Sequence, residues 1–301
     1  MRIGIDLGGS HIAVAVVSSK NTIIAKREKD ILNFEQIKDM KEYIVENIKM
    51  LTSQVLKDVG APSCIITQIG IATPGRIENN IIYDMYNLGI KEFELGQILS
   101  KHYGIEVKIR NDAKCSALAE KKIGNLQECD DCVFLCLGTG IGGATFINGR
   151  MLEYTKDWGS EYGHMIIKKD GLECKCGNKG CFEKYASMQA FKQGFIKLLN
   201  LNKEIESTEI LKILKEKVNE NNQEVNEYIN KYIDDLIIGI MNICNIIAPE
   251  AICIGGSFVY FEKVLYTRLI ERINSKKYNR IAPKIILAKL GNDAGIIGAL
   301  M

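Results

Sequence analysis

The sequence predicts a two-domain α/β protein, because short apolar strands alternate with amphipathic helices along 301 residues. A single hydrophobic core rarely grows beyond roughly 250–300 residues, so this length favours two domains. A strand, a glycine-rich turn and a second strand occur twice, with the turns at residues 8–10 and 138–143. The repeat indicates two domains of related topology.

In the first part of the chain, apolar runs bounded by Gly, Asn, Ser or Pro predict strands, and apolar residues at helical spacing predict helices. The expected strands are Arg2–Asp6, His11–Ser18, Thr22–Asp30, Cys64–Ala72 and Glu106–Ile109. The expected helices are Phe34–Asp58, Leu95–Tyr103 and Ala113–Ile123.

The same criteria apply to the second part. They predict strands at Val133–Leu137, Gly143–Ile147, Met151–Tyr154, Ala251–Ile254 and Lys284–Ala288. Charged helical sequence runs from Glu204 to Ile247, with a break near Asn219–Asn222, and a helix of small residues begins at Ala294. We expect an N-terminal domain over 1–112 and a C-terminal domain over 113–301, with the last helix, about 293–301, packing back toward the N-terminal domain.

Charge and composition exclude several classes of protein. Lys and Arg number 39 against 37 Asp and Glu, a net charge of +2, which predicts no nucleic-acid or anionic-membrane partner. No apolar run reaches the roughly 18–20 residues of a membrane span, and no secretory signal is evident at the start. The expected location is therefore the cytoplasm, where ten cysteines favour metal ligation over disulfides.

Glycine turns after buried strands are candidate phosphate sites. Backbone N–H groups bind phosphate oxygens well, and glycine lets the backbone approach closely. The candidates are Asp6 with Gly8, Gly9 and Ser10, then Gly138, Thr139 and Gly140, and a third turn at Gly255 and Gly256. Asp6 could hold the water shell of Mg²⁺. Each turn could instead simply close a hairpin or end a strand, and no P-loop motif is present.

Three cysteines within eight residues predict a zinc site. Cys174, Cys176 and Cys181 are separated by glycines that let the chain turn back, and His164 lies ten residues before the first cysteine. Three thiolates and one imidazole form a closed tetrahedral site, which is typical of structural zinc.

Three acids lie beside turns or the cysteine loop: Asp112, Glu161 and Glu183. A carboxylate can accept hydrogen bonds from neighbouring hydroxyls, so such a set suits a sugar. One of them could also take the proton from an attacking hydroxyl.

Together these motifs resemble the ROK family of sugar kinases and sugar-responsive repressors, within the actin-like ATPase superfamily. The resemblance rests on Asp6–Ser10, Ala72–Arg76, Asn87-Leu88, Asn111–Ala113, Gly138–Gly143, Glu161–His164, Cys174–Glu183, Ile254–Ser257 and Asp293–Gly295. It implies a two-domain actin-like (ribonuclease H-like) fold with an interdomain cleft and a structural zinc loop.

The resemblance also implies residue roles, with ATP, Mg²⁺ and a free hexose as ligands. Asp112 would be the general base. The sugar would be bound by Asn111, Glu161, His164 and Glu183, with Gly75, Arg76 and Asn87 at the pocket edge. Mg²⁺ and the phosphates would be held by Asp6 and the first two glycine turns, and adenosine by Gly255 and Gly256. His164 would also ligate zinc with the three cysteines.

Several alternatives stay open at this stage. The resemblance implies a glucokinase that makes glucose 6-phosphate, while N-acetylmannosamine, allose or fructose are other candidate substrates. A non-catalytic sugar sensor is the alternative of another class; it is disfavoured because Asp6 leaves no room for a preceding DNA-binding domain. A homodimer would be usual for this family. Lys114 departs from the family pattern beside Asp112, and we expect it at the surface.

Overall fold

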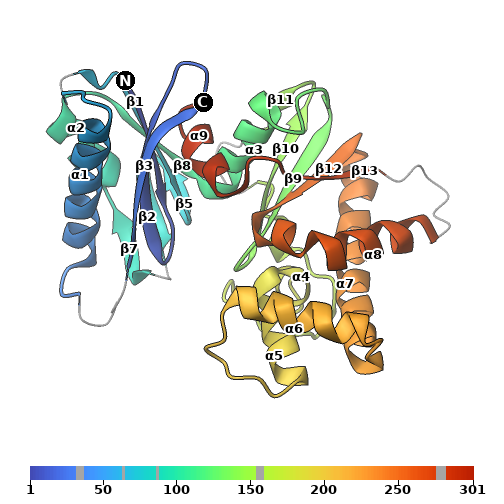
Figure 1. Ribbon diagram of the computed structural model, residues 1–301. Helices are drawn as coiled ribbons and strands as arrows, with labels where there is room; N and C mark the ends of the chain where they lie inside the picture. The colour runs from blue at the N-terminus through green and yellow to red at the C-terminus, as the bar shows by residue number, and fades with distance from the viewer. Residues whose placement is uncertain (32–36, 63–64, 86–87, 154–158, 276–282) are drawn as a thin grey trace. The chain divides into compact units, whose positions relative to one another are not determined.

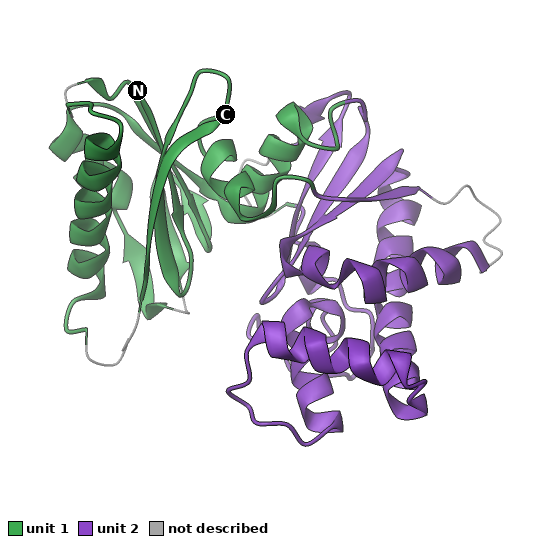
Figure 2. Ribbon diagram, viewed as in Figure 1, with its two compact units in different colours: residues 1–127, 153–159, 289–301 green, residues 128–152, 160–288 purple. Residues whose placement is uncertain are grey.

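A computed structural model describes residues 1–31, 37–62, 65–85, 88–153, 159–275 and 283–301. The chain forms two compact units (Figure 2). Unit 1 contains residues 1–127, 153–159 and 289–301, and unit 2 contains residues 128–152 and 160–288. The first division falls after residue 127, so the helix that follows Asn111 belongs to unit 1, as do the last thirteen residues of the chain.

Unit 1 is built on a five-stranded mixed sheet with the order β3-β2-β1-β4-β8. Its strands are β1 (Arg2–Leu7), β2 (His11–Val17), β3 (Ile23–Asp30), β4 (Gln68–Thr73) and β8 (Val107–Asn111). The first three form an antiparallel meander, whereas β1, β4 and β8 are parallel to one another. The parallel strands therefore all end at one edge of the sheet.

Helices cover both faces of this sheet (Figure 1). On one face α1 (Met40–Asp58) and α2 (Leu95–Tyr103) pack against the Ile, Leu and Val side chains of β1 and β2 that point to that face. On the other face α3 (Asp112–Ile123) contacts α9 (Ala294–Gly298), which lies against the alternate side chains of β2. The period of two along each strand thus separates two layers of core.

Helix α1 begins later than its apolar pattern predicts. The side chain of Asp39 accepts a hydrogen bond from the Glu42 N–H at 3.0 Å, which satisfies one of the free donors of the first turn. The predicted start at Phe34 falls outside the described residues, and Ile37 precedes the helix. Apolar spacing alone did not reveal the capping residue.

Two paired glycines let α9 lie directly on the sheet. Gly4 of β1 and Gly70 of β4 are register partners. A Cβ at Gly4 would come within 2.4 Å of the Ile296 carbonyl oxygen, and one at Gly70 within 1.9 Å of the Ala299 carbonyl oxygen. Any larger residue at either position would push the helix away from the strands.

A buried carboxylate anchors the segment by which the chain returns to unit 1. Glu120 of α3 is fully buried, and its side chain accepts hydrogen bonds from the backbone N–H groups of Lys289 and Leu290, both at 2.7 Å. It also accepts one from the N–H of Asn125 at 2.9 Å. The position from which α9 starts is therefore set by one side chain.

Unit 2 repeats the sheet of unit 1. Its strands are β9 (Cys132–Leu137), β10 (Ile141–Ile147), β11 (Arg150–Met151), β12 (Ala251–Gly255) and β13 (Lys284–Leu287), in the order β11-β10-β9-β12-β13. Again the first three are antiparallel, and β9, β12 and β13 are parallel. The predicted relation between the two halves is confirmed by this shared order and direction.

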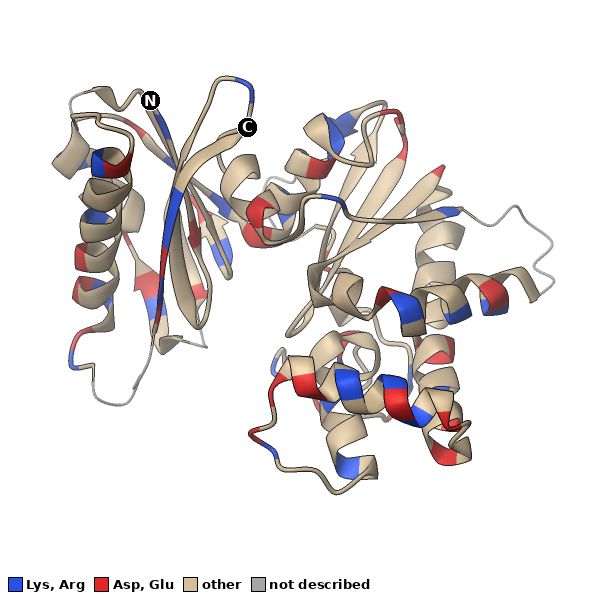
Figure 3. Ribbon diagram, in the orientation of Figure 1, with Lys and Arg blue, Asp and Glu red and all other residues tan. Residues whose placement is uncertain are grey.

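The remaining core of unit 2 is helical. Its helices are α4 (Glu183–Ala186), α5 (Met188–Leu198), α6 (Ser207–Asn219), α7 (Gln223–Ile247) and α8 (Glu262–Ser275). The predicted break near 219–222 is confirmed, since Asn222 caps α7 by accepting from the Val225 N–H at 3.0 Å. Acidic and basic residues both occur along α6 (Figure 3). Within the described part of the chain, no helix is long and apolar enough to cross a membrane.

Several elements were not predicted. A separate three-stranded sheet in unit 1 consists of β5 (Arg76–Glu78), β6 (Ile81–Met85) and β7 (Ile90–Phe93), whose strands are too short to show a clear period. Helices α5 and α8 were also missed. The strand expected from Cys64, a residue outside those described, begins only at Gln68.

We expect Glu120→Ala to lower the free energy of unfolding by about 3 kcal/mol or more, because three buried N–H groups would lose a charged acceptor. Denaturant unfolding of the purified variant would measure the loss. As a control, Glu216→Ala on the exposed side of α6 should change stability by no more than about 0.5 kcal/mol. Equal stability of the two variants would contradict the anchoring role.

Candidate functional site

The parallel strands of unit 1 bring the predicted site residues Asp6, Asn111 and Asp112 to one edge of the sheet. Asp6 of β1 is the register partner of Ala72 of β4, and Thr73 is the partner of Asn111 of β8. Asp6 and the Asn111-Asp112 pair therefore lie at the carboxyl ends of β1 and β8, two parallel strands on either side of β4. This edge is where ligands bind in open α/β sheets.

Asn111 and Asp112 form the N-terminus of α3. The Asn111 side chain accepts from the N–H groups of Ala113 and Lys114, at 3.0 and 3.3 Å, and donates to the Gly75 carbonyl oxygen at 3.4 Å. Asp112 Oδ1 accepts from the Ala113 N–H at 2.8 Å. Asp112 is half-buried at this helix N-terminus, a position where a negatively charged side chain is stabilising.

The first turn of α3 also corrects one expectation. Lys114 is buried, with 7% of its surface exposed, and does not lie at the surface. Its neighbours Ala113 and Cys115 are buried as well, because this turn is enclosed by the sheet edge and α9. Burial raises the pKa of the Cys115 thiol; Arg110 opposes this rise, and the carboxylates of Asp112 and Asp6 add to it.

Asp6 is enclosed by two further residues. Its Oδ2 lies 3.7 Å from Nε2 of His11, at the start of β2, and a Cβ on Gly295 of α9 would lie 3.4 Å from the same oxygen. The interaction with Asp6 raises the pKa of His11, with smaller contributions from Glu28 and Asp30, and burial opposes the rise. His11 was not predicted as part of the site; its only sequence signal is a polar residue directly after the glycine turn.

Gly75 and Arg76 each have a structural role in unit 1: Gly75 through its backbone conformation and Arg76 through its ion pairs. Gly75 has φ of 100°, and a Cβ there would meet the Tyr83 carbonyl oxygen at 2.5 Å. The Arg76 guanidinium pairs with Glu78 and, at 3.8 Å, with Asp84, and it lies 4.5 Å from the centre of the Tyr83 ring. Its charge is thus already engaged within the β5–β6 hairpin. Asn87 lies outside the described residues.

In unit 2, the second glycine turn follows β9 directly. The Gly138 N–H donates to the Gly140 carbonyl oxygen at 3.0 Å, while the Gly138 carbonyl oxygen accepts from Gln189 N–H at 3.1 Å. Thr139 at the tip is exposed. The third turn lies beside this one: Gly256, with φ of 72°, approaches Leu137 so closely that a Cβ would be 2.5 Å from its carbonyl oxygen.

Glu183 connects the second glycine turn with the cysteine loop. A Cβ on Gly140 would lie 2.4 Å from Glu183 Oε2, so the carboxylate occupies the space beside the turn. Its other oxygen, Oε1, accepts from the Cys174 thiol at 3.1 Å. The turn predicted to bind phosphate and the acid predicted to bind sugar hydroxyls are therefore immediate neighbours.

The predicted metal ligands come together. The donor atoms of His164, Cys174, Cys176 and Cys181 all lie within 4.8 Å of one another. His164 Nδ1 is 3.7 Å from Cys174 Sγ, and the Sγ atoms of Cys176 and Cys181 are 3.6 Å apart. Tetrahedral zinc, with bonds of about 2.3 Å to sulfur and 2.0–2.1 Å to nitrogen, places its ligand atoms roughly 3.5–3.8 Å apart. The donor set fits zinc.

His164 faces two groups with its two ring nitrogens. Nδ1 points to the cysteine cluster, and Nε2 lies 4.0 Å from Oε2 of Glu161. A carboxylate beside the second nitrogen commonly orients a metal-bound imidazole. Glu161 is thus placed next to the cluster.

The predicted site residues fall into two groups. Unit 1 carries those at the ends of β1, β4 and β8, namely Asp6, Gly8, Gly9, Ser10, Gly75, Arg76, Asn111 and Asp112. Unit 2 carries the others that are described, namely Gly138, Thr139, Gly140, Glu161, His164, Cys174, Cys176, Cys181, Glu183, Gly255 and Gly256.

The chain has three histidines, so an NMR titration can follow His11 directly. We expect its pKa to lie above 6.5, and Asp6→Asn to lower it, because the Asp6 carboxylate is the main cause of the rise. The pair should add stability below the ordinary pKa of histidine and lose this effect as pH rises through the raised value. A wild-type pKa at or below 6.5 would contradict the contact.

Comparison with known proteins gives relatives of more than one kind. The chain is 29% identical to a glucokinase of Thermotoga maritima over 99% of this chain and 95% of the relative. It is 28% identical to a xylose repressor of Caldicellulosiruptor bescii, covering 99% and 76% of the two chains. An N-acetylmannosamine kinase of Haemophilus influenzae is 27% identical, with 99% and 93% covered.

Among solved structures, a ROK family glucokinase from Streptomyces griseus in complex with glucose and AMPPNP has the same fold. The TM-score is 0.81 at 24% identity, over 99% of this chain and 97% of that one. The ROK family sequence model matches residues 2–301. The chain therefore belongs to the ROK family.

Proposed function

We propose that this protein is a kinase that transfers the γ-phosphoryl group of ATP to a hydroxyl of a free hexose, with glucose as the first candidate substrate and glucose 6-phosphate as its product. The observation that carries the proposal is the contact between Gly140 and Glu183. It joins a turn suited to phosphate oxygens with a carboxylate suited to sugar hydroxyls.

In this proposal Asp112 is the general base. The hexose hydroxyl gives its proton to the Asp112 carboxylate while its oxygen bonds to the γ-phosphorus, and the bond to the leaving ADP oxygen breaks. Asn111 fixes the helix N-terminus beside the base through its bonds to Ala113 and Lys114. Such transfer depends mainly on positioning and charge neutralisation.

The sugar would be bound by Asn111, Glu161, His164 and Glu183, with Gly75, Arg76 and Asn87 at the rim. Because Arg76 already pairs with Glu78 and Asp84, we expect it to shape the rim and not to carry a free charge to the sugar. Zinc would support this set from the side, since Glu183 contacts Cys174 and Glu161 lies next to His164.

The phosphates of ATP would lie against the glycine turns of residues 8–10 and 138–140, with adenosine at Gly255 and Gly256. The oxygen ligands of Mg²⁺ would include Asp6, directly or through water, and bound Mg²⁺ would neutralise phosphate charge. His11 beside Asp6 adds a second cation at lower pH.

We expect a homodimer, which light scattering of the purified protein would test.

A second candidate function follows from the repressor relative. Xylose repressors share this domain over nearly the whole chain, so the protein could sense a sugar without phosphorylating it. If the protein is a kinase, N-acetylmannosamine is the main alternative substrate, because the N-acetylmannosamine kinase of Haemophilus influenzae is almost as similar to this chain as the glucokinase. Allose and fructose are further candidates.

An ADP-release assay with MgATP would separate these possibilities. The panel should contain glucose, mannose, fructose, allose, N-acetylglucosamine and N-acetylmannosamine. We expect strong turnover with one hexose. Sugar binding without turnover across the panel, from folded and zinc-loaded protein, would instead favour the sensor.

We expect Asp112→Asn to fold normally and to lose about 10²–10⁴-fold in kcat, because the amide cannot accept the proton. Asp58→Asn is a matched control, since Asp58 pairs with Arg27 on the surface of unit 1 and should leave kcat unchanged. Near-wild-type turnover of Asp112→Asn would remove this residue as the base.

Metal analysis should find about one zinc per chain. We expect Cys176→Ser to lose the metal together with sugar binding, while Cys244→Ser, in α7 and outside the cluster, should retain both. An active wild-type enzyme that contains no zinc would contradict the structural role of the metal.

A further inference from the structure

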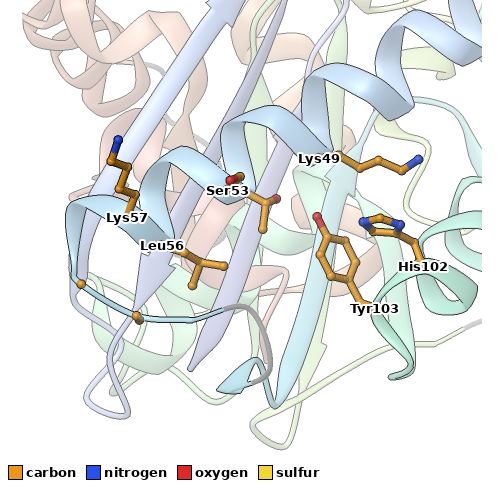
Figure 4. Close-up of a pocket in the computed structure, with 9 residues that line it drawn as sticks. Lys49, Ser53, Leu56, Lys57, His102 and Tyr103 are labelled. Atoms are coloured by element: carbon orange, nitrogen blue, oxygen red, sulfur yellow. The ribbon is translucent and has the colours of Figure 1, made fainter.

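A cavity of about 560 Å³ lies between α1 and α2 of unit 1, within the size range of small-molecule sites. It is lined by Lys49, Thr52, Ser53, Leu56, Lys57, Gly60, Ala61, His102 and Tyr103. Neither the glycine turns nor the acids of the proposed kinase site contribute to it. In Figure 4, His102 and Tyr103 of α2 face α1, and Lys49 extends above His102.

The cavity wall contains a buried hydroxyl group without a hydrogen bond. Thr52 is 1% exposed, and its Oγ1 finds no hydrogen-bond partner among the described residues. The Tyr103 phenol is close enough for an interaction: burial raises the pKa of Tyr103, and the Thr52 hydroxyl and Lys49 oppose the rise. No hydrogen bond of normal geometry forms between the two hydroxyls, however. A buried hydroxyl without a hydrogen bond is rare, because it costs about 1–3 kcal/mol.

The charged side chains that line this cavity are basic. Among the described residues that line the cavity, Lys49, Lys57 and His102 are basic and none is acidic. Glu46 pairs with Lys49 at 2.9 Å, but this acid is 62% exposed, so a ligand could displace it at little cost. Lysines are also common near helix C-termini, so the basic residues alone would not indicate a site.

We propose that this cavity binds a phosphate monoester of a small polyhydroxy compound, a sugar phosphate. The phosphate group would be held by Lys49 and His102, with Lys57 as a further cation at the other end of the cavity. The ligand hydroxyls would bond to Thr52, Ser53 and Tyr103, which gives the buried Thr52 hydroxyl the partner it lacks in the chain. This inference does not rest on the proposed kinase function.

NMR titration of the full chain with glucose 6-phosphate and, separately, with orthophosphate would test the site. The His102 resonance reports on the cavity and the His164 resonance on the candidate sugar site, so binding at the two places is distinguished. We expect millimolar or lower glucose 6-phosphate to shift His102. Orthophosphate should bind at least about tenfold more weakly, since it lacks the hydroxyl contacts.

Two variants with a matched control make the test specific. Lys49→Met should weaken glucose 6-phosphate binding at His102 by about tenfold or more, whereas Lys101→Met, on α2 but outside the cavity, should not. Thr52→Val should also weaken binding without lowering the Tm of the free protein, because the Thr52 hydroxyl makes no hydrogen bond of normal geometry.

Three results would overturn the inference. The first is a His102 resonance that millimolar glucose 6-phosphate leaves unchanged. The second is equal loss of binding in Lys49→Met and Lys101→Met, which would indicate non-specific attraction. The third is equal affinity for orthophosphate and glucose 6-phosphate, which would remove the sugar part of the ligand. None of these results depends on whether the ADP-release assay detects a kinase.

Discussion

The architecture of unit 1 depends on the buried carboxylate of Glu120. By accepting the N–H groups of Lys289 and Leu290, it fixes the point at which the chain re-enters this unit. From there α9 crosses the sheet over the paired glycines Gly4 and Gly70. The same helix brings Gly295 against Asp6. Glu120, on the same helix as Asp112, therefore helps to enclose Asp6, a predicted site carboxylate.

Both units place their predicted site residues at the same kind of position. In each, the central strand of a mixed sheet ends in a glycine turn, and parallel neighbours end beside it. Parallel strands bring residues that are distant in sequence to a common edge, as with Asp6 and Asn111. In unit 2, Glu183 then ties the turn at Gly140 to Cys174, so one acid links two motifs with different chemistry.

The basic residues near the candidate site differ in their contacts and in their burial. Arg76 is held by two acids and a tyrosine, whereas Lys114 is enclosed in the first turn of α3. His11 lies beside Asp6, and its pKa responds to that carboxylate. The cavity between α1 and α2 belongs to the opposite face of the sheet from α9, so its basic residues serve a separate surface.

The sequence by itself determined the fold class, the two-fold repeat, the glycine turns and the cluster of one histidine and three cysteines, because these depend on local periodicity and on the spacing of particular residue types. It located the break between α6 and α7, and it identified the Asn111-Asp112 pair at a helix N-terminus. It missed the short strands β5 to β7, whose few residues carry little periodic signal.

Only the tertiary structure decided the environments of individual side chains. The burial of Lys114, the His11–Asp6 contact and the unpartnered Thr52 hydroxyl each arise from elements that are far apart in sequence or that meet across a turn. Residue type and spacing specify which groups can bind a metal or accept a proton. The packing of helices on a sheet specifies what lies beside each group, and therefore its charge, its exposure and its hydrogen bonds.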